Sequence, residues 1–479
     1  MRTTFSSRLL LTCALSSAPF SAFAAPLSAS DIFSQFNAVI FGSFTSTSDV
    51  EGRTVVGGAM TGGATFNIAP GSAAASSYAG LTVYGNQTGT GHYNINNGAG
   101  VTILGSNAGS FAMNGGGSGW VGGSNSGALS VSGGAGSVAV GGGNTGQLSL
   151  SAGGSVYVAG SNTGQINVNG GSGAVAVMGA TTNGITLSNG GSVYAGGTTA
   201  NGNINVNGAS GSVSINGSNG AQVTLNSGGT ARIAGNTGNV NMNGGSLLYT
   251  GSVTGSVNLN GGATKTQVAN AGITTPTAPS LTVGAFAATF QAPMLALSAQ
   301  LDAMTANSVA TRVGNALTFA AAPDANGRAV FDVGSSVFAP NSTVTIQLNG
   351  ASTVIINVNV DSCVAAVCAL SLPNSLNFVN PTGYAERVLW NFVNATSIAF
   401  PNEFGGSVLA PLATVTNQTP IDGTLVAAAY NGNGELHSYS FKGSFSSQAV
   451  PEPCSMAAIA SGLAGLAWFR RRRSRRKAL

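Results

Sequence analysis

The chain has 479 residues, of which only 6% are charged and 72 are glycine. A soluble protein usually has about 25% charged residues, so solubility here must come from Asn, Ser and Thr. The formal net charge of +4 arises at the two ends of the chain, and the body between them is mildly acidic. The body therefore lacks the basic patch that a nucleic-acid-binding surface needs.

The N-terminal segment MRTTFSSRLLLTCALSSAPFSAFAAP is typical of a secretory signal peptide. Two arginines precede a short apolar stretch, and Ala22, Ala24 and Ala25 supply the small residues of a cleavage site. We expect cleavage after Ala24, so that residues 1–24 are removed. A membrane anchor is the alternative, but the apolar stretch is short and broken by Ser and Pro. The secretion translocon and signal peptidase are the expected partners.

Residues 86–262 contain two interleaved series of three-residue apolar segments, each recurring about every 17–19 residues. The first series includes YNI at 93, LSL at 148 and VNL at 257. The second includes VTI at 101, WVG at 120 and LLY at 247. Apolar–polar–apolar alternation predicts short strands, and a fixed period predicts stacked units. We predict an all-β fold, a β-solenoid of about ten two-strand coils of 18–19 residues. A disordered Gly/Ser/Asn-rich spacer is the alternative.

The central residues of the first series are expected to point outward and to form a polar ladder along one face. Such a ladder keeps a sheet soluble, or it binds a repetitive partner such as a glycan or ice. The residues we assign to this candidate ladder are Asn167, Thr186, Asn205, Thr224, Asn241 and Asn258.

Residues 86–262 contain a single charged side chain, Arg232, and no carboxylate. Glycoside hydrolysis requires a pair of carboxyl groups, so this region cannot supply that chemistry. We expect no enzyme activity, no cofactor and no metal. His437, Glu435 and Asp422 near the end of the body fit no metal motif by spacing, and a structural role is expected for the histidine. A structural calcium at Asp49 and Asp422 is a weaker possibility.

Residues 263–308 are expected to be a linker and a helix that flanks the solenoid. The helix is predicted from a stripe of apolar residues at helical spacing, namely Phe290, Met294, Leu297, Leu301 and Met304. Residues 309–447 then show strand patterns. Cys363 and Cys368 within DSCVAAVC suit a disulfide in an oxidising compartment, although two free thiols remain the alternative.

Several segments on both sides of the repeats resemble the choice-of-anchor A family of bacterial surface proteins. They are FNAVIFGSFTSTSDVEGRTVVGG, VIINVNV, LWNFVNATSI, GSVLAPLATVT, IDGTLVAAAY and GELHSYSFKG. The resemblance divides the domain into residues 25–85 and 309–447, with residues 86–262 as an insertion. It implies a β-solenoid with a flanking helix, an adhesive role and no catalytic residues. A weaker resemblance links the chain to bacterial ice-binding solenoids. Whether the insertion shares one core with its flanks stays open at this stage.

The C-terminal residues 448–479 resemble a PEP-CTERM sorting signal. Its signature is Val450, Pro451, Glu452 and Pro453, followed by a short apolar run expected to form a transmembrane helix. Seven basic residues should stay in the cytoplasm: Arg470, Arg471, Arg472, Arg473, Arg475, Arg476 and Lys477. The resemblance implies an inner-membrane precursor that an exosortase cuts near the motif, in a bacterium that makes exopolysaccharide. A plain membrane anchor is the alternative.

These observations favour an exported structural or adhesive protein of the cell surface or extracellular matrix, with exopolysaccharide or another surface glycan as its partner. An ice-binding solenoid is the alternative function. A polysaccharide-active enzyme is a third hypothesis, which the scarcity of acids, Lys and His argues against.

Overall fold

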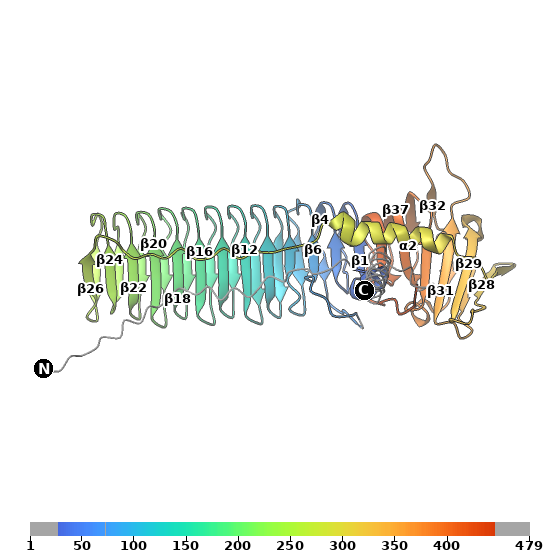
Figure 1. The fold of residues 1–479 in the computed structure, drawn as a ribbon, viewed down its shortest axis with the longest axis horizontal. Helices are drawn as coiled ribbons and strands as arrows, with labels where there is room; N and C mark the ends of the chain where they lie inside the picture. Colours follow the sequence, from blue (N-terminus) through green and yellow to red (C-terminus); the bar gives the residue numbers. More distant parts are fainter. Residues whose placement is uncertain (1–26, 72, 446–479) are drawn as a thin grey trace, which may run out of the picture. The chain divides into compact units, whose positions relative to one another are not determined.

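Each coil of the chain has three sides, and like sides of successive coils pair in parallel to form continuous faces (Figure 1). The computed structural model describes residues 27–71 and 73–445, and residues 27–443 belong to one compact unit. The predicted solenoid is therefore confirmed. Its pairing follows the sequence repeat, because residues one period apart occupy equivalent positions in neighbouring coils.

The first side, sheet A, carries the longest strands. In order of pairing, its strands are β29 (Arg328–Gly334), β31 (Thr353–Asn359), β34 (Val388–Phe392), β37 (Ser407–Asn417), β39 (Leu425–Gly432), β1 (Ala38–Ile40), β3 (Thr54–Val56), β6 (Leu81–Val83), β8 (Val101–Ile103), β10 (Gly117–Val121), β12 (Gly136–Val140), β14 (Gly154–Val158), β16 (Gly173–Val177), β18 (Gly191–Ala195), β20 (Gly211–Ile215), β22 (Gly229–Ile233), β24 (Ser246–Tyr249) and β26 (Thr264–Gln267).

The second side, sheet B, carries the short alternating triplets. Its strands are β36 (Phe404–Gly405), β38 (Ile421–Asp422), β40 (Leu436–His437), β5 (Thr65–Phe66), β7 (His92–Ile95), β9 (Ser110–Asn114), β11 (Leu129–Ser132), β13 (Leu148–Leu150), β15 (Ile166–Val168), β17 (Ile185–Leu187), β19 (Ile204–Val206), β21 (Val223–Leu225), β23 (Val240–Asn243) and β25 (Val257–Asn260). Val50 bridges both Leu436 and Phe66 and so connects the two groups of strands.

The third side was not predicted. Near the middle of the stack it consists of β32 (Ala369–Ser371), β35 (Ser397–Phe400), the C-terminal parts of β37 and β39, β2 (Phe44–Ser46) and β4 (Met60–Gly62). Along the repeats it shrinks to single-residue bridges, which run from Gln87 through Asn107 and Asn125 to Thr237 and Val253. The two-strand coil of the prediction is thus a three-sided coil.

The two flanks and the repeats share one apolar core. The chain begins in the middle of the stack, where α1 (Ala29–Gln35) leads into β1 and β1 pairs with both β3 and β39. The repeats build one arm of the stack and residues 309–443 build the other. The core runs without a break from Ala38 through Leu187 to Leu436. This continuity answers the question that the sequence left open.

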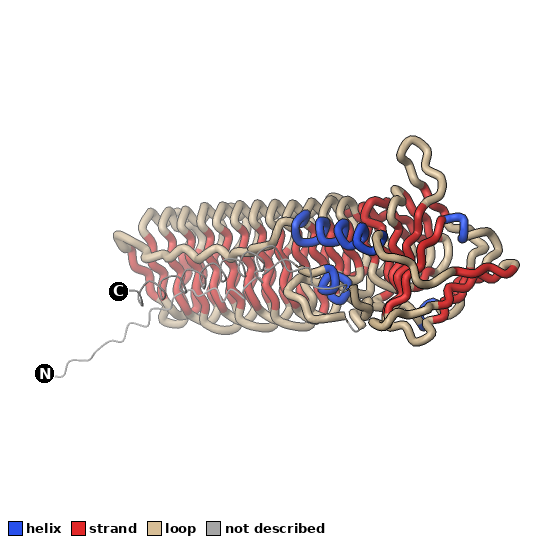
Figure 2. The backbone as a smooth tube through the Cα atoms, turned by 45° about the vertical axis from the view of Figure 1, so that its right-hand side comes forward, coloured by secondary structure: helices blue, strands red, loops and turns tan. Residues whose placement is uncertain are grey.

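Between the two arms, the chain returns along the outside of sheet A. Residues 268–285, here called the strap, cross the strands of the repeat arm in extended form (Figures 1 and 2). A π-helical turn, η1 (Ala287–Gln291), and helix α2 (Ala292–Asp302) follow, and α2 packs on β31, β34 and β37 of the other arm. Phe290, Met294, Leu297 and Leu301 are buried, as the apolar stripe predicted. Met304 lies beyond the helix and is half-buried.

The C-terminal arm also carries a separate four-stranded sheet. It consists of β27 (Ala310–Val313), β28 (Ala316–Ala320), β30 (Thr343–Gln347) and β33 (Asn377–Phe378), and short 3-10 turns lie at η2 (Ser335–Val337) and η3 (Pro381–Gly383). None of the helices in the described residues combines the length and hydrophobicity that a bilayer crossing requires.

The close stacking of coils explains part of the glycine content. Gly154 has a φ of +113°, and a Cβ atom there would lie 1.9 Å from the carbonyl oxygen of Gly136 in the coil below. Only glycine accepts both the left-handed backbone and this approach.

One detail of the second repeat series was wrong. The triplet WVG at 120 begins one residue out of register with the other triplets of its series, because Trp120 pairs with Thr102 and Ala139 and points outward, while Val121 is buried. The glycine at position 119 stands where neighbouring coils have an apolar residue, and this gap obscured the register.

Candidate functional site

The outer surface of sheet A is occupied by the chain itself. Trp120, Tyr157 and Tyr194 alternate there with alanines, and Ile273 of the strap packs against this row. Arg232 donates a hydrogen bond of 2.7 Å to the carbonyl oxygen of Ala271 in the strap. On the other arm, Ser298 of α2 donates to Asn391 at 2.7 Å. Any long binding surface must therefore lie on sheet B or on the third side.

Sheet B presents the outward ladder that the sequence predicted. Its strands are in register, so Asn167 stands beside Thr186, Thr186 beside Asn205, and so on to Asn258. These side chains are half-buried by their neighbours, except Asn258, which is exposed. The inward residues on either side, such as Ile185 and Leu187, are fully buried. The structure thus places all six residues in one column, and their binding role stays a prediction.

Neighbouring rungs of sheet B are joined by side-chain hydrogen bonds. Asn258 donates to Asn241 at 2.8 Å. In the next column, Asn226 donates to Asn207 and Ser188 donates to Asn169, each at 2.5 Å. Along the repeats this face is therefore polar and carries no Asp, Glu, Lys or Arg side chain, and these bonds join some of its neighbouring side chains.

The third side carries a second polar ladder, which the sequence reasoning missed. Four asparagines are buried there, Asn107, Asn125, Asn144 and Asn162. The side-chain amide of each of the first three donates a hydrogen bond of 2.7 Å to the side-chain oxygen of the next one. Each also donates to the backbone carbonyl two residues on, at 2.7–2.8 Å. The ladder continues as Thr181, Thr199, Asn219 and Thr237. We call this column the buried Asn ladder.

The signal that would have identified this ladder is the recurring Gly-x-Asn or Gly-x-Thr before each short triplet, as in GSNSG and GSNTG. A single inward residue per coil gives no alternation of apolar and polar residues, so the strand pattern did not reveal it.

A groove lies along the third side at residues 86–145, with a volume of about 490 Å³. The residues that precede the ladder positions, Asn86, Ser106, Ser124 and Gly143, line one side. The residues that follow them, Thr88, Ala108, Ser126 and Thr145, line the other. Gln87, Asn107 and Asn125 form the floor.

His437, Glu435 and Asp422 come together where the two arms meet. His437 Nδ1 lies 2.6 Å from Asp422 Oδ1, and Nε2 lies 3.0 Å from Glu435 Oε2. The hydrogen bond to Asp422, opposed by partial burial, raises the pKa of His437 to about 9. Glu51, shortly before β3, adds electrostatic attraction and also accepts a hydrogen bond from the backbone of Ser438 at 2.8 Å.

This junction cluster is structural in its geometry. Asp422 is fully buried. Burial raises the pKa of Glu403, and a side-chain hydrogen bond with Asp422 and the negative charge of that carboxylate raise it further. Burial likewise raises the pKa of Tyr384, whose hydroxyl has no hydrogen-bond partner among the residues that the structure describes. Within the part of the chain that the structure describes, no group of three or more His, Cys, Asp or Glu side chains is arranged to hold a metal ion.

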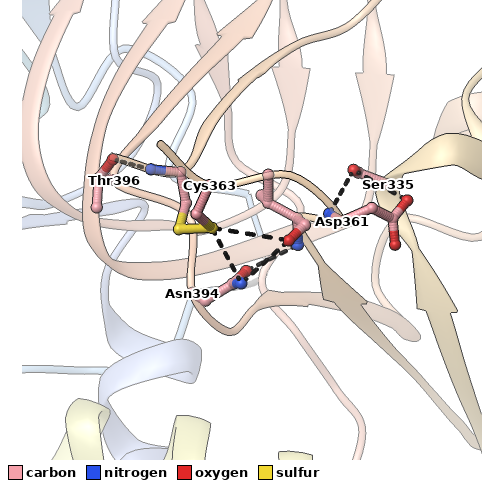
Figure 3. The surroundings of a disulfide bond; sticks show 7 residues. Ser335, Asp361, Cys363, Asn394 and Thr396 are labelled. Atoms are coloured by element: carbon pink, nitrogen blue, oxygen red, sulfur yellow. Dashed lines mark hydrogen bonds between the residues drawn. A yellow bond between two sulfur atoms is a disulfide. The ribbon is translucent and has the colours of Figure 1, made fainter. Parts of the chain in front are cut away.

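Cys363 and Cys368 are joined by a disulfide bond in the loop before β32 (Figure 3). The loop turns at Ala365 and Ala366, which both have positive φ. Val364 at its tip is 78% exposed. Asn394 donates to the carbonyl oxygen of Val360 at 3.2 Å and so ties the loop to the neighbouring coil. The bond therefore closes a small exposed hairpin, as the spacing suggested.

The remaining predicted site residues lie outside the described residues. They are the cleavage-site residues Ala22, Ala24 and Ala25, the motif Val450 to Pro453, the apolar run expected to cross the membrane, and the basic residues from Arg470 to Lys477.

Comparison with known families gives two matches. Residues 29–128 and 180–438 match the family described as "Putative Ice-binding-like adhesive domain". Residues 449–473 match the PEP-CTERM protein-sorting motif. A search of curated proteins found no match to this chain.

Two solved structures show a distant likeness. One is an ice-binding protein from an Antarctic bacterium, Flavobacteriaceae, at 13% identity and a TM-score of 0.19, covering 86% of this chain and 98% of that one. The other is the tapirin C-terminal domain of Caldicellulosiruptor kristjanssonii, at 13% identity and a TM-score of 0.13, covering 85% and 94%. At such scores neither structure bears on the function.

The adhesive-domain match covers most of the chain on both sides of the repeat centre, and the sorting motif directs such a protein to the cell surface. The chain is thus an exported, surface-directed protein that belongs to the ice-binding-like adhesive domain family and ends in a PEP-CTERM signal.

Proposed function

We propose that this protein is a structural adhesin of the cell surface or extracellular matrix that binds exopolysaccharide or another surface glycan. The observation that carries the proposal is the uncharged outer face of sheet B, whose ladder runs in register from Asn167 to Asn258. Amide and hydroxyl groups both donate and accept hydrogen bonds, as the hydroxyl groups of a glycan do.

The occupied outer side of sheet A supports this choice of surface. The strap and α2 cover that side, so a long ligand meets sheet B and the third side. The scarcity of charge favours a neutral, repetitive ligand over an ionic one. The enzyme hypothesis gains little from the geometry, because Asp422 is fully buried and its neighbour His437 is held between carboxylates.

We further propose that the precursor is held in the inner membrane by its C-terminal segment until an exosortase cuts it near Pro451–Pro453. The sorting-motif match supports this route. Mass spectrometry of the mature protein should then give a chain that starts at Ala25 and ends near the motif. A mature chain that keeps Arg470 to Lys477 would contradict the processing step.

Adhesion is tested by retention of the secreted protein on the producing cell's own exopolysaccharide. We expect Asn167→Leu/Thr186→Leu to weaken retention, because it removes two adjacent hydrogen-bonding rungs from sheet B. The control Val309→Ala changes an exposed residue on the far arm and should bind normally. Retention no better than that of an unrelated protein of equal charge would contradict the adhesive function.

Ice binding is the second candidate, favoured by the regular rung spacing of about 4.8 Å and by the family description. A thermal hysteresis and recrystallisation assay tests it. Altered crystal growth that is lost in Asn167→Leu/Thr186→Leu would favour ice over a glycan, and unaltered crystal growth would remove this candidate.

A further inference from the structure

The groove on the third side differs from sheet B in the state of its side chains. Within the described residues, Thr88, Ser124 and Thr145 form no side-chain hydrogen bond. Ser106 uses its hydroxyl oxygen only to accept from the backbone of Ser124, at 3.2 Å. Asn86 likewise only accepts, from the backbone of Ser106 at 2.8 Å. The groove therefore presents donors with no partner, whereas several side chains on sheet B bond one another.

The floor of the groove is rigid and fully paired. The buried Asn ladder fixes it, since Asn107 and Asn125 each donate both to the next coil and to a backbone carbonyl at 2.7–2.8 Å. The backbone on this side also pairs with the coils above and below. A peptide strand could not add to it by backbone pairing, because no strand edge is free there.

The charges near the groove limit the class of ligand. Residues 86–262 carry one charged side chain, Arg232, and it is held by the strap on sheet A. An anion or a cation would find no opposite charge to replace its hydration. A neutral ligand rich in hydroxyl groups has no charge to desolvate. It can exchange hydrogen bonds with the free Ser, Thr and Asn groups.

The axial spacing of the coils favours an elongated ligand with a repeating unit. Equivalent side chains recur along the axis at about 4.8 Å, which is close to the length of one pyranose ring in an extended chain. The groove crosses the coils of Asn86, Ser106, Ser124 and Gly143 and has a volume of about 490 Å³. This size lies within the usual range of about 300–1,000 Å³ for small-molecule sites.

We infer that the groove at residues 86–145 binds a short stretch of a neutral, linear glycan, with one sugar unit to about one coil. The inference rests on the proposed glycan adhesion, and it adds a specific site and ligand class. The groove is the point at which a single polysaccharide chain is held along the solenoid axis, separate from the outer ladder of sheet B.

The test is a titration of the purified secreted protein with linear hexasaccharides of β-1,4-linked glucose and of β-1,4-linked N-acetylglucosamine. The groove variant is Ser106→Leu/Ser124→Leu, which fills one side and removes two hydroxyl groups. Both positions are exposed, so the fold should persist, and an unchanged thermal unfolding midpoint checks this. The matched control is Ser218→Leu/Ser252→Leu, in the same column but outside the groove.

We expect at least a 10-fold loss of hexasaccharide affinity in the groove variant. The matched control and the sheet B variant Asn167→Leu/Thr186→Leu should bind within twofold of the wild type. Equal binding by the groove variant, or loss in the sheet B variant alone, would overturn the inference while adhesion stands. So would failure of both hexasaccharides to bind a protein that is retained on exopolysaccharide. Failure of retention on exopolysaccharide would overturn the adhesion proposal and the inference together.

Discussion

The two arms of the solenoid reach stability by different means. The repeat arm uses small, similar coils whose inward Val, Ile and Leu contact only adjacent coils, with the buried Asn ladder beside them. The C-terminal arm uses irregular coils around large aromatic side chains, among them Trp390, Phe331 and Phe404. In a stack of repeats, stability is roughly a sum over neighbours. We therefore expect damage to stay local in the repeat arm and to spread in the C-terminal arm.

The largest effect should follow Trp390→Ala. Trp390 is fully buried, its ring centre lies 5.2 Å from that of Phe404 and 5.5 Å from that of Phe319, and its Nε1 donates to the carbonyl of Gly405 at 2.9 Å. Truncation should cost about 3–5 kcal/mol. Hydrogen exchange should accelerate throughout the C-terminal arm. Accelerated exchange limited to the coil of β34 would contradict the proposed difference between the arms.

Asn144→Ala should have the next largest effect. It removes a buried amide that donates to Gly146 and Asn162 and accepts from Asn125. Leaving these partners unsatisfied should cost about 2–4 kcal/mol. Exchange should accelerate only in the adjacent coils. The control is Thr145→Ala, an exposed neighbour that should change stability by less than about 0.5 kcal/mol, and a similar loss in both variants would refute the role of the ladder.

The junction between the arms should respond to alkaline pH. Because the pKa of His437 is raised to about 9 by Asp422 and Glu435, its stabilising contribution is complete below its unfolded pKa of about 6.5. That contribution is lost as the pH rises through about 9, at a cost of about 1–2 kcal/mol after allowance for solvent screening.

Thermal unfolding of the wild type and of His437→Gln between pH 6 and pH 10 measures this effect. The difference between the two proteins should shrink as the pH rises. Glu51 and Glu403 also interact with the histidine, so both proteins are measured at every pH and only the difference between them is interpreted. A constant difference would show that the charge of His437 does not stabilise the junction.

The smallest effect should follow Arg232→Ala, which removes the hydrogen bond to Ala271 of the strap. We expect a loss of about 0.5–1.5 kcal/mol and faster proteolysis within residues 268–285. Lys265→Ala, at an exposed site on the last strand, is the control. Unchanged cleavage of the strap would mean that packing of Ile273 alone holds it on sheet A.

The sequence predicted sheet B well because its coils alternate apolar and polar residues at a constant period, as Ile185, Thr186 and Leu187 do. Sheet A was predicted with one error, at Trp120, where a glycine replaces the inward residue. The third side was missed because one inward Asn or Thr per coil produces no alternation of apolar and polar residues. The strap was read as a linker, since its contacts with Arg232 and Tyr194 depend on residues 39 and 81 positions away.

The candidate sites could be predicted to the same extent as the sides of the coil on which they lie. The outward column from Asn167 to Asn258 was predictable, because outward residues of a regular strand are fixed by their inward neighbours. The groove lies on the third side of the coil. Because the sequence did not predict that side, it did not predict the residues that line the groove either. The junction cluster was recognised as a set of residues, but its partner Glu51 comes from the other end of the chain.

The N-terminal and C-terminal pieces of the chain form adjacent coils of one continuous solenoid. Thr45 and Asn431 are exposed partners on β2 and β39, at a spacing that a disulfide can bridge. We expect Thr45→Cys/Asn431→Cys to form an intramolecular disulfide in the secreted protein and Thr45→Cys/Thr163→Cys to form none. Free thiols in the first variant, or cross-links only between molecules, would contradict the single stack.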